Sequence, residues 1–485
     1  MTRYLPLMFI GLASGFTTRA RHTVVHRSDV KQRLIWRDRY HATLHASSTD
    51  DTNGEFCEIG VNAVEECNSI TGTESQFSAA TNLGKCICGA GSFALPHVFL
   101  EEGVLGGTLA ITTCGVLAAY TIQSLSRSKA IASAELGAKP VTSYVELAES
   151  ALGKNAANLV FTLTLCASIG VCSTYLVFIG QTLESLSCDA SSGNIIRQLF
   201  PDTSEFAWEA GAAAVLYPLS LIRDYSVFAF TSALGVFAVV GGILVTLASG
   251  IFVDPGGGLG VAIESIENLR MWPESLADAF GGSFGTIAYL FCVNFLSFPI
   301  MNSMKDPKQF DGAVDWAVSG VWIVNIVFAI LCLGFYGDAT EDLVLANLDN
   351  GPYLSALKIL LCVDLLFTFP IVFSSGRQIL ENALIGSERV ESDEAVVPRA
   401  GIVAGAVSAC FGLAQIGGFG AVANLVGGVA QGTLAFIMPP AIAVTLARRN
   451  EQELAGGEAS QLLVGVFGAA VVSSVTYFTA VGMIQ

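Results

Sequence analysis

Two charged side chains lie within stretches that are otherwise free of charge. Lys85 is the only Lys, Arg, Asp or Glu between Ser75 and Leu100, and Asp364 is the only one between Ile359 and Gly376. Charges inside a membrane are costly and usually serve ion or substrate pathways. Thr368, one helical turn after Asp364, offers a hydroxyl oxygen to a cation. The structural alternative is that Lys85 extends to the membrane interface and that Asp364 and Thr368 bond locally.

Two glycine-rich interruptions stand near the middle of apolar stretches. The first is Cys88-Gly89-Ala90-Gly91-Ser92, followed by Pro96, and the second runs from Gly281 through Phe291-Cys292-Val293-Asn294 to Pro299. Glycine and proline weaken helical geometry, and non-helical backbone survives at membrane depth only where it lines a cavity or a site. Such paired interruptions are typical of secondary transporters. Glycine-rich packing faces are the alternative.

The composition indicates the class of protein that carries these features. Of 485 residues, 52% are hydrophobic and 13% are charged, whereas soluble domains average about 25% charged residues. We therefore predict an integral membrane protein in contact with the lipid bilayer. The net charge of −17 excludes nucleic acid as a natural partner. No catalytic or ATP-binding motif has a supporting context, and the cysteines lack zinc-site spacing, so we expect no catalytic residues, no metal and no cofactor.

Eleven stretches are apolar and long enough to cross a bilayer, which takes about 20 residues. The predicted fold class is therefore an all-α multi-pass membrane protein with eleven transmembrane helices. If the N-terminus lies inside, twelve Lys or Arg residues fall on the inner side and three on the outer, which fits the retention of positive charge in cytoplasmic loops. The stretches are 75–100, 103–126, 155–183, 206–222, 226–253, 279–304, 316–337, 359–376, two within 400–447, and 459–485.

Residues 1–49 differ in composition from the rest of the chain. Residues 1–16 contain a short apolar run like that of a signal peptide, and residues 17–49 carry seven Lys or Arg but two acids, as transit peptides do. The pair resembles a bipartite presequence and predicts the plastid envelope. A basic tail is the alternative, with a vacuolar, endomembrane or plasma-membrane location. Residues 50–76 hold seven acids and no basic residue, which predicts a disordered linker.

Four segments resemble the amino acid/auxin permease family. Residues 82–96 contain its N-x-x-K, G-x-G and A-L-P pattern. Residues 170–178 resemble its third helix, 298–310 its segment after the sixth helix, and 334–340 the stretch that ends its seventh helix. The resemblance implies a LeuT-type five-plus-five inverted repeat and an eleventh helix, with helices 1 and 6 unwound. It divides the transporter domain 77–485 into a first repeat at 77–253, a second at 278–447 and a last helix at 459–485. It also implies uptake or export of neutral amino acids coupled to H+ or Na+.

The resemblance also assigns roles to residues. It implies that Lys85 and Asp364 approach each other at a cation site, with Thr368 nearby. The substrate carboxylate should meet the backbone of the first interruption, and its amino group the carbonyls of the second. Tyr175 could donate its hydroxyl to the carboxylate, or it could simply pack in the core. The predicted substrate-binding residues are Gly89, Ala90, Gly91, Ser92, Tyr175, Phe291, Cys292, Val293 and Asn294.

Several alternatives remain open at this point. The proton-coupled animal branch of the family has an acidic residue in the sixth helix, where this chain has Phe291 to Asn294, and it lacks a carboxylate at the position of Asp364. The coupling ion therefore stays H+ or Na+. An amino acid sensor of the same fold with little flux, or a carrier of aromatic or auxin-like acids, competes with the transporter. The oligomeric state is open.

Overall fold

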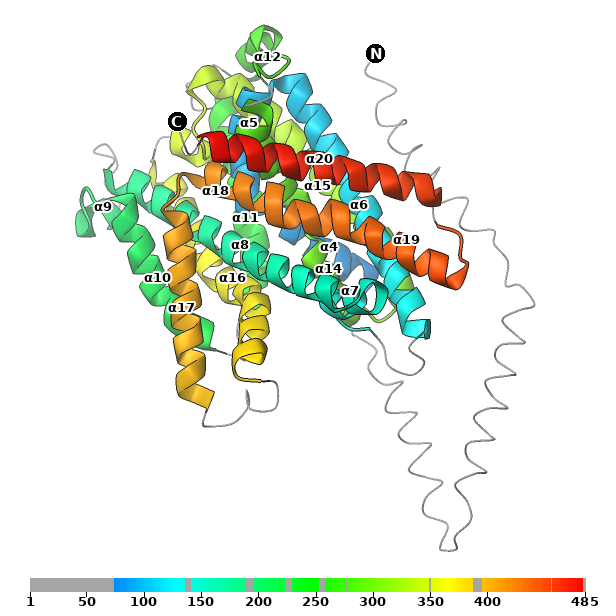
Figure 1. Ribbon diagram of the computed structural model, residues 1–485. Coiled ribbons are helices and arrows are strands. Elements are labelled where there is room, and N and C mark those ends of the chain that lie inside the picture. Colours follow the sequence, from blue (N-terminus) through cyan, green and yellow to red (C-terminus); the bar gives the residue numbers. More distant parts are fainter. Residues whose placement is uncertain are drawn as a thin grey trace, which may run out of the picture.

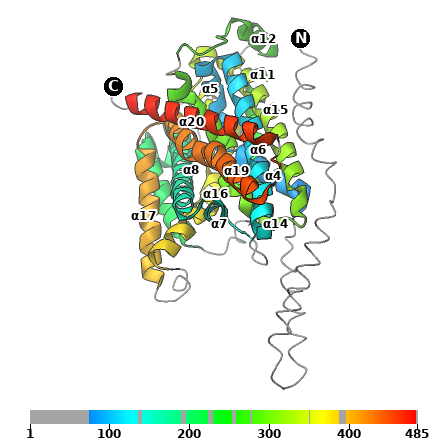
Figure 2. The same cartoon turned by 45° about the vertical axis from the view of Figure 1, so that its right-hand side comes forward.

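The computed structural model describes residues 74–135, 141–188, 195–222, 229–252, 258–275, 278–348, 350–386, 395–454 and 456–482. These residues form a bundle of helices (Figures 1 and 2), and their one β-feature is an isolated bridge between Glu74 and Met304. Within them, eight helices are long and apolar enough to span a membrane, or nine if one bent pair counts as a span. The protein is therefore an integral multi-pass membrane protein.

The helices follow one another along the chain with short connections. Their bounds are α4 (Gln76–Ile87), η2 (Ala90–Ala94), α5 (Leu95–Glu102), α6 (Val104–Glu135), α7 (Tyr144–Leu152), α8 (Lys154–Cys188), α9 (Ile195–Leu199), α10 (Glu205–Leu221), α11 (Ala229–Phe252), α12 (Gly258–Asn268), η4 (Asp278–Ser283), α13 (Phe284–Phe291), α14 (Asn294–Ser303), η5 (Pro307–Gln309), α15 (Phe310–Tyr336), η6 (Gly337–Ala339), η7 (Val344–Asn347), α16 (Pro352–Leu384), α17 (Val396–Ala414), α18 (Phe419–Leu425), η9 (Val426–Gln431), η10 (Thr433–Ile437), α19 (Met438–Asn450) and α20 (Gly457–Gly482).

Two of the expected eleven spans do not reach the spanning length within the described residues. They correspond to α10, which has 17 residues, and α11, of which only the apolar part Phe237–Phe252 qualifies as a shorter helix. The count of eleven, and the division into repeats, stay predictions. The uncharged stretch 400–447 is divided between α17 and the span Phe419–Asn450, which begins with α18. The turn between α17 and α18 contains Gly417 and Gly418. The presequence and nearly all of the linker lie outside the described residues.

Two long helices organise the bundle. Helix α8 packs against α16, α10, α7 and α17, and α15 packs against α4, α6, α5 and α12. Figures 1 and 2 show α19 and α20 side by side across one face of the bundle, and Figure 1 shows α10 beside α17. The two halves of the first spanning helix, α4 and α5, thus lie against α15.

Small residues allow the helices to approach closely, as is usual where lipid supplies little hydrophobic drive for helix association. A Cβ atom at Gly170 of α8 would lie 2.3 Å from a methyl group of Val426, and one at Gly428 would lie 2.4 Å from Val475 of α20. Gly285 of α13 is similarly tight, because its N–H donates to Asn424 Oδ1 over 2.7 Å. These contacts fix η9 against α8 and α20, and α13 against α18.

Candidate substrate and ion site

The first spanning helix is broken near its middle. Helix α4 ends at Ile87, Gly89 is extended, and the chain continues as the 3₁₀ turn η2 into α5, so that the two parts are bent by 45°. Ser92 N–H donates to Gly89 O over 3.1 Å, and Cys88 N–H donates to Gly84 O over 2.7 Å. These bonds close short turns on each side of Gly89. The predicted residues Gly89 to Ser92 thus form the link between the two half-helices.

The second interruption is milder. Helix α13 ends at Phe291 and α14 begins at Asn294, yet residues 284–303 continue as one span of 20 residues. Cys292 N–H bonds Ala288 O over 2.8 Å, and Val293 N–H bonds Phe291 O over 2.9 Å. The Phe291 carbonyl therefore already accepts a hydrogen bond from the backbone, as does Val293 O, from Leu296 N–H over 2.9 Å.

The first break lies directly against α13. A Cβ atom at Gly91 would lie 2.8 Å from Leu290 Cδ1 and 3.2 Å from Tyr289 Cε1. A larger residue than glycine at position 91 would therefore push the two segments apart. The Tyr289 hydroxyl also hydrogen-bonds Thr174 Oγ1 of α8 over 2.7 Å. Tyr289 thus connects the first break to α8.

Lys85 and Asp364 are brought together beside the break. Lys85 Nζ lies 3.8 Å from Asp364 Oδ1, and the two side chains are 18% and 5% exposed. Thr368 Oγ1 donates to Asp364 Oδ1 over 3.4 Å. One charge comes from the half-helix α4 and the other from α16. The pair therefore links a half-helix to a continuous one.

Helix α11 covers this ion pair at a glycine. A Cβ atom at Gly235 would lie 2.0 Å from Asp364 Oδ1 and 2.6 Å from Lys85 Nζ. Any side chain there would displace the carboxylate, the ammonium or α11 itself. The sequence offered no local signal for this contact, because Gly235 stands in a uniformly apolar helix far from both charged residues along the chain.

Other predicted site residues turn away from the first break. The Phe291 ring lies against Gly115 of α6, where a Cβ atom would be 3.4 Å from Phe291 Cε1. Asn294 Nδ2 donates to Thr121 Oγ1 of α6 over 3.1 Å. Cys292 and Val293 are buried, and Tyr175 is half-buried on α8. The side chains of Phe291 and Asn294 therefore pack against α6, which leaves the backbone of this segment as the part available to a substrate.

An aromatic cluster that sequence reasoning missed covers the first break. The Phe93 ring lies 6.2 Å from Phe178 and 5.9 Å from Phe328, and Phe419 lies 6.2 Å from both Phe178 and Tyr289. All these rings except that of Tyr289 are fully buried. They come from η2, α8, α13, α15 and α18. Aromatic residues are common in membrane helices, and only their convergence in space singles these out.

Polar groups bridge the α5 end of the site. His97 Nδ1 lies 2.9 Å from Thr340 O, and Gly420 N–H donates to both carboxylate oxygens of Asp342 over 3.1 and 3.2 Å. Burial raises the pKa of the Asp342 carboxyl above its ordinary value, while the Gly420 N–H and the charge of His97 act in the opposite direction. These contacts tie α5 and α18 to the connection between α15 and α16.

Comparison with known proteins decides the family. The family model described as "Transmembrane amino acid transporter protein" matches residues 72–482. The chain belongs to this family. Its members are transporters rather than enzymes, and no group of three or more His, Cys, Asp or Glu in the described part of the chain is arranged to hold a metal ion.

Individual relatives of this chain are also named amino acid transporters. The chain is 27% identical to amino acid transporter AVT3C of Arabidopsis thaliana, over 63% of this chain and 70% of the relative. It is 25% identical to amino acid transporter ANT1 of the same plant, over 76% and 85%. It is 24% identical to vacuolar amino acid transporter 7 of Saccharomyces cerevisiae, over 65% and 61%. A solved Na+-coupled sialic acid symporter aligns with 86% of this chain and 93% of its own, at 13% identity and a TM-score of 0.42, too distant to support an argument.

Proposed function

We propose that this family member is a secondary active transporter that moves neutral amino acids by alternating access, driven by a gradient of H+ or Na+. The observation that carries the proposal is the ion pair between Lys85 and Asp364, which joins the half-helix α4 to α16 beside the break at Gly89. A charge pair between a half-helix and a neighbouring helix can hold the half-helix in one position, and it releases the half-helix when one of the two charges is neutralised.

The substrate is expected at the meeting point of the two interruptions. Backbone N–H groups at the start of a helix attract anions, so the segment from Gly89 to Ser92, which leads into α5, would bind the carboxylate. Carbonyls between Phe291 and Asn294 would accept from the amino group. The Phe93, Phe178, Phe419 and Tyr289 rings would surround the side chain. This apolar surrounding favours neutral substrates of small or medium size, because a charged side chain would lose its hydration there.

The coupling ion would act on Asp364. Protonation of its carboxylate would remove the attraction to Lys85 and free α4 to move relative to α16. In the Na+-coupled alternative, Na+ would bind Asp364 and the Thr368 hydroxyl, and would displace the Lys85 ammonium. Both schemes separate Lys85 from Asp364, and only the Na+ scheme uses the Thr368 hydroxyl as a ligand.

Counterflow of radiolabelled amino acids into proteoliposomes tests the proposal. We expect counterflow of neutral amino acids. We also expect net uptake of the same amino acids, which stops when the gradient of the coupling ion is collapsed. Removal of Na+ and collapse of the pH gradient, done separately, identify the ion. Binding without counterflow would instead indicate a sensor, and competition by tryptophan or indole acids would indicate an aromatic or auxin-like substrate.

Tyr289 provides a direct test of the substrate position. Tyr289→Phe removes one hydrogen bond to Thr174, which is worth about 1 kcal/mol, or about fivefold in apparent affinity. Thr174→Val should have the same effect, and the double variant should be no worse than either single variant if the bond is the cause. Tyr477→Phe, at an exposed tyrosine of α20, is the control and should transport normally.

The membrane and the orientation are also proposals. We expect the end of the bundle with Lys305 and Lys308 to face the cytoplasm or stroma, and the plastid envelope to be the location. A reporter fused behind residues 1–50 tests the location, and a reporter that stays in the cytosol or reaches only the cell surface would refute it. The yeast relative is named a vacuolar amino acid transporter, which favours a vacuolar membrane as the competing location.

A further inference from the structure

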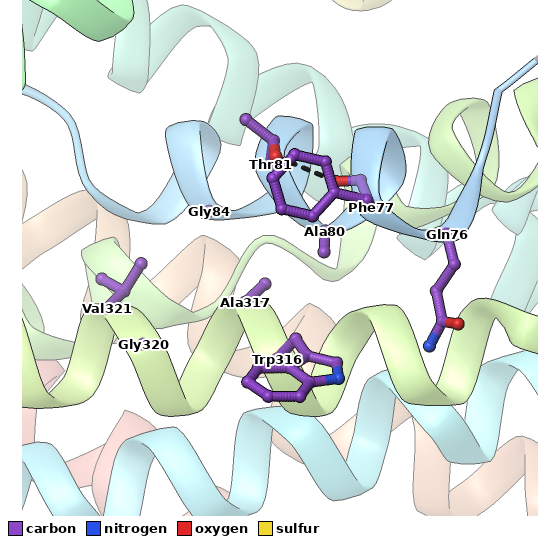
Figure 3. Close-up of a pocket in the computed structure, with 9 residues that line it drawn as sticks. All are labelled: Gln76, Phe77, Ala80, Thr81, Gly84, Trp316, Ala317, Gly320 and Val321. Atoms are coloured by element: carbon purple, nitrogen blue, oxygen red, sulfur yellow. Dashed lines mark hydrogen bonds between the residues drawn. The ribbon is translucent and has the colours of Figure 1, made fainter.

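An apolar groove separates α4 from α15 on the outside of the bundle (Figure 3). It has a volume of about 490 Å³ and is lined by Ala80, Thr81 and Gly84 on one side and by Trp316, Gly320 and Val321 on the other. Phe77 and Trp316 flank it and are 82% and 75% exposed. The groove lies away from the substrate site, because α4 presents Lys85 to α16 and this face to α15.

The walls offer hydrocarbon rather than hydrogen bonds. The Thr81 hydroxyl donates to Phe77 O over 2.8 Å, as the dashed line in Figure 3 marks, so it is already satisfied within α4. At one end, the Gln76 amide reaches α15, where a Cβ atom at Gly312 would lie 2.4 Å from Gln76 Nε2. Along the rest of the groove the walls suit an apolar occupant.

The size of the groove suits one acyl chain. An apolar cavity of about 150 Å³ accepts one benzene molecule, so 490 Å³ corresponds to roughly 20 carbon atoms by the same measure. From Gln76 to Gly84 the groove follows eight residues of helix, or about 12 Å. This length takes only part of an extended acyl chain, and the volume accepts the rest if the chain bends.

Basic side chains stand at the Gln76 end of the groove. The backbone N–H of Lys305 donates to the carbonyl of Glu74 over 2.9 Å, and Glu74 stands two residues before Gln76. Lys308 lies in η5, which leads directly into α15. Both lysines are exposed.

The acids at this end already accept hydrogen bonds. Glu74 Oε2 accepts from Asn82 Nδ2 over 3.0 Å. Asp306 accepts from Lys308 N–H and from the Gln309 amide, each over 3.1 Å. Among the described residues neither lysine forms an ion pair with these carboxylates, so the ammonium groups of Lys305 and Lys308 are available to a phosphate at the membrane surface.

We propose that this groove is a binding site for an anionic phospholipid, with one acyl chain between α4 and α15 and the phosphate at Lys305 and Lys308. The site goes beyond transport itself, since it requires neither substrate nor coupling ion. Because Gly84 precedes Lys85, the bound chain would contact the half-helix that carries the ion pair. Lipid binding would thereby hold α4 against α15.

Quenching of Trp316 fluorescence by brominated phospholipids tests the proposal on the full chain in vesicles. The signal of Trp316, one of five tryptophans, is obtained by difference from Trp316→Phe. Brominated phosphatidylglycerol should quench it at a mole fraction at least about tenfold lower than brominated phosphatidylcholine, because two lysines attract the anionic headgroup. Equal quenching by the two lipids would show ordinary boundary lipid and would overturn the proposal.

Two matched pairs of variants locate the site. Gly320→Phe fills the groove, and Gly405→Phe makes the same change in α17; both positions are exposed and offer open space to a Cβ atom. Only Gly320→Phe should lose the phosphatidylglycerol preference, by about tenfold. The double variant Lys305→Gln, Lys308→Gln leaves the walls intact and should also lose it, whereas Lys154→Gln should not.

Three further results would contradict the proposal. The preference could survive Gly320→Phe, it could fall equally in Gly405→Phe, or Trp316 could prove unreachable by any brominated phospholipid. The last result would mean that a sterol, residues 1–73 of the chain or another protein occupies the groove.

Discussion

Helix α16 carries two buried ion pairs that differ in what they connect. Asp364 pairs with Lys85 of α4 at 3.8 Å, and the lysine side chain stays 18% exposed. Glu381 pairs with Arg377 one turn away on the same helix at 3.6 Å, and both side chains are at most 4% exposed. The first pair joins two separate segments at a break, whereas the second lies within one continuous helix.

The two pairs also differ in the hydrogen bonds that surround them. Arg377 Nη1 also donates to Ser220 O over 2.6 Å and to Ile222 O over 3.3 Å, which fastens α16 to the end of α10. Asp364 receives only a long hydrogen bond from Thr368 besides its ion pair in the described contacts. A pair within one continuous helix stabilises one arrangement, whereas a pair between a half-helix and another helix can separate when the half-helix moves. We therefore assign stability to the Arg377 pair and transport to the Lys85 pair.

The largest expected effect comes from breaking the Lys85 pair. Lys85→Met and Asp364→Asn should each lower counterflow at least about 100-fold, because an uncompensated buried charge costs about 3–5 kcal/mol. We expect this free-energy cost to lower transport rather than stability, because the half-helix α4 can shift so that the remaining charge reaches water, and the shifted α4 no longer pairs with α16. Counterflow in proteoliposomes measures the loss, and a thermal melt in detergent should change little. Lys154→Met, at an exposed lysine, is the control. Full transport with unchanged pH dependence in Lys85→Met would remove this pair from the mechanism.

Breaking the Arg377 pair should have the opposite signature. Arg377→Met removes the ion pair with Glu381 and the donor to the Ser220 and Ile222 carbonyls at the end of α10, so the same cost of about 3–5 kcal/mol should appear as lost stability. We expect a lower melting temperature and less folded protein, but near-normal counterflow per folded molecule. Arg399→Met, at an arginine whose Nε donates to Ala395 O one turn earlier in the chain, should melt like the parent. If Arg377→Met abolished counterflow at normal stability, the contrast between the pairs would fail.

The sequence predicted the two pairs unequally, for a physical reason. Lys85 and Asp364 stand out because each is a lone charge in an apolar stretch, and their meeting was implied only by the family resemblance. The sequence predicts that Lys358 and Arg377 lie in loops, because they stand just before and just after the predicted span 359–376. In the structure α16 extends beyond that stretch at both ends, and Lys358 is buried with Asn350 Oδ1 at 2.6 Å.

Contacts between distant segments were the least predictable part. Tyr289 meets Thr174 across 115 positions, and Gly235 meets the ion pair from another helix. Neither residue interrupts the charge-free stretch in which it lies, so hydropathy does not single it out. The family motif in residues 82–96, in contrast, lies at the first break itself, where glycine and proline are required locally. The membrane class and the first break could be derived from the sequence, and the packing around that break could not.

A smaller effect is expected at the glycine that covers the Lys85 pair. Gly235→Ala introduces a methyl group 2.0 Å from the present position of Asp364 Oδ1, so α11 or the carboxylate must move. We expect about a tenfold loss of counterflow, in line with the 1–3 kcal/mol typical of overpacking. Gly241→Ala on the same helix places its Cβ at an ordinary 3.8 Å from Leu357 and should be silent. Equal effects at the two positions would mean that α11 as a whole, rather than the pair, is sensitive.

The smallest effect separates the two coupling schemes. Thr368→Val removes a 3.4 Å hydrogen bond to Asp364 Oδ1, and a bond of that length contributes at the low end of about 0.5–1.5 kcal/mol. If H+ is the coupling ion, counterflow should fall only about twofold, because the proton binds the carboxylate alone. If Na+ is the ion, the lost hydroxyl is a ligand, and the apparent Na+ affinity should fall much further. Thr368→Ser, which keeps the oxygen, should restore the parent value in both cases, so a Na+ titration of these two variants decides between the schemes.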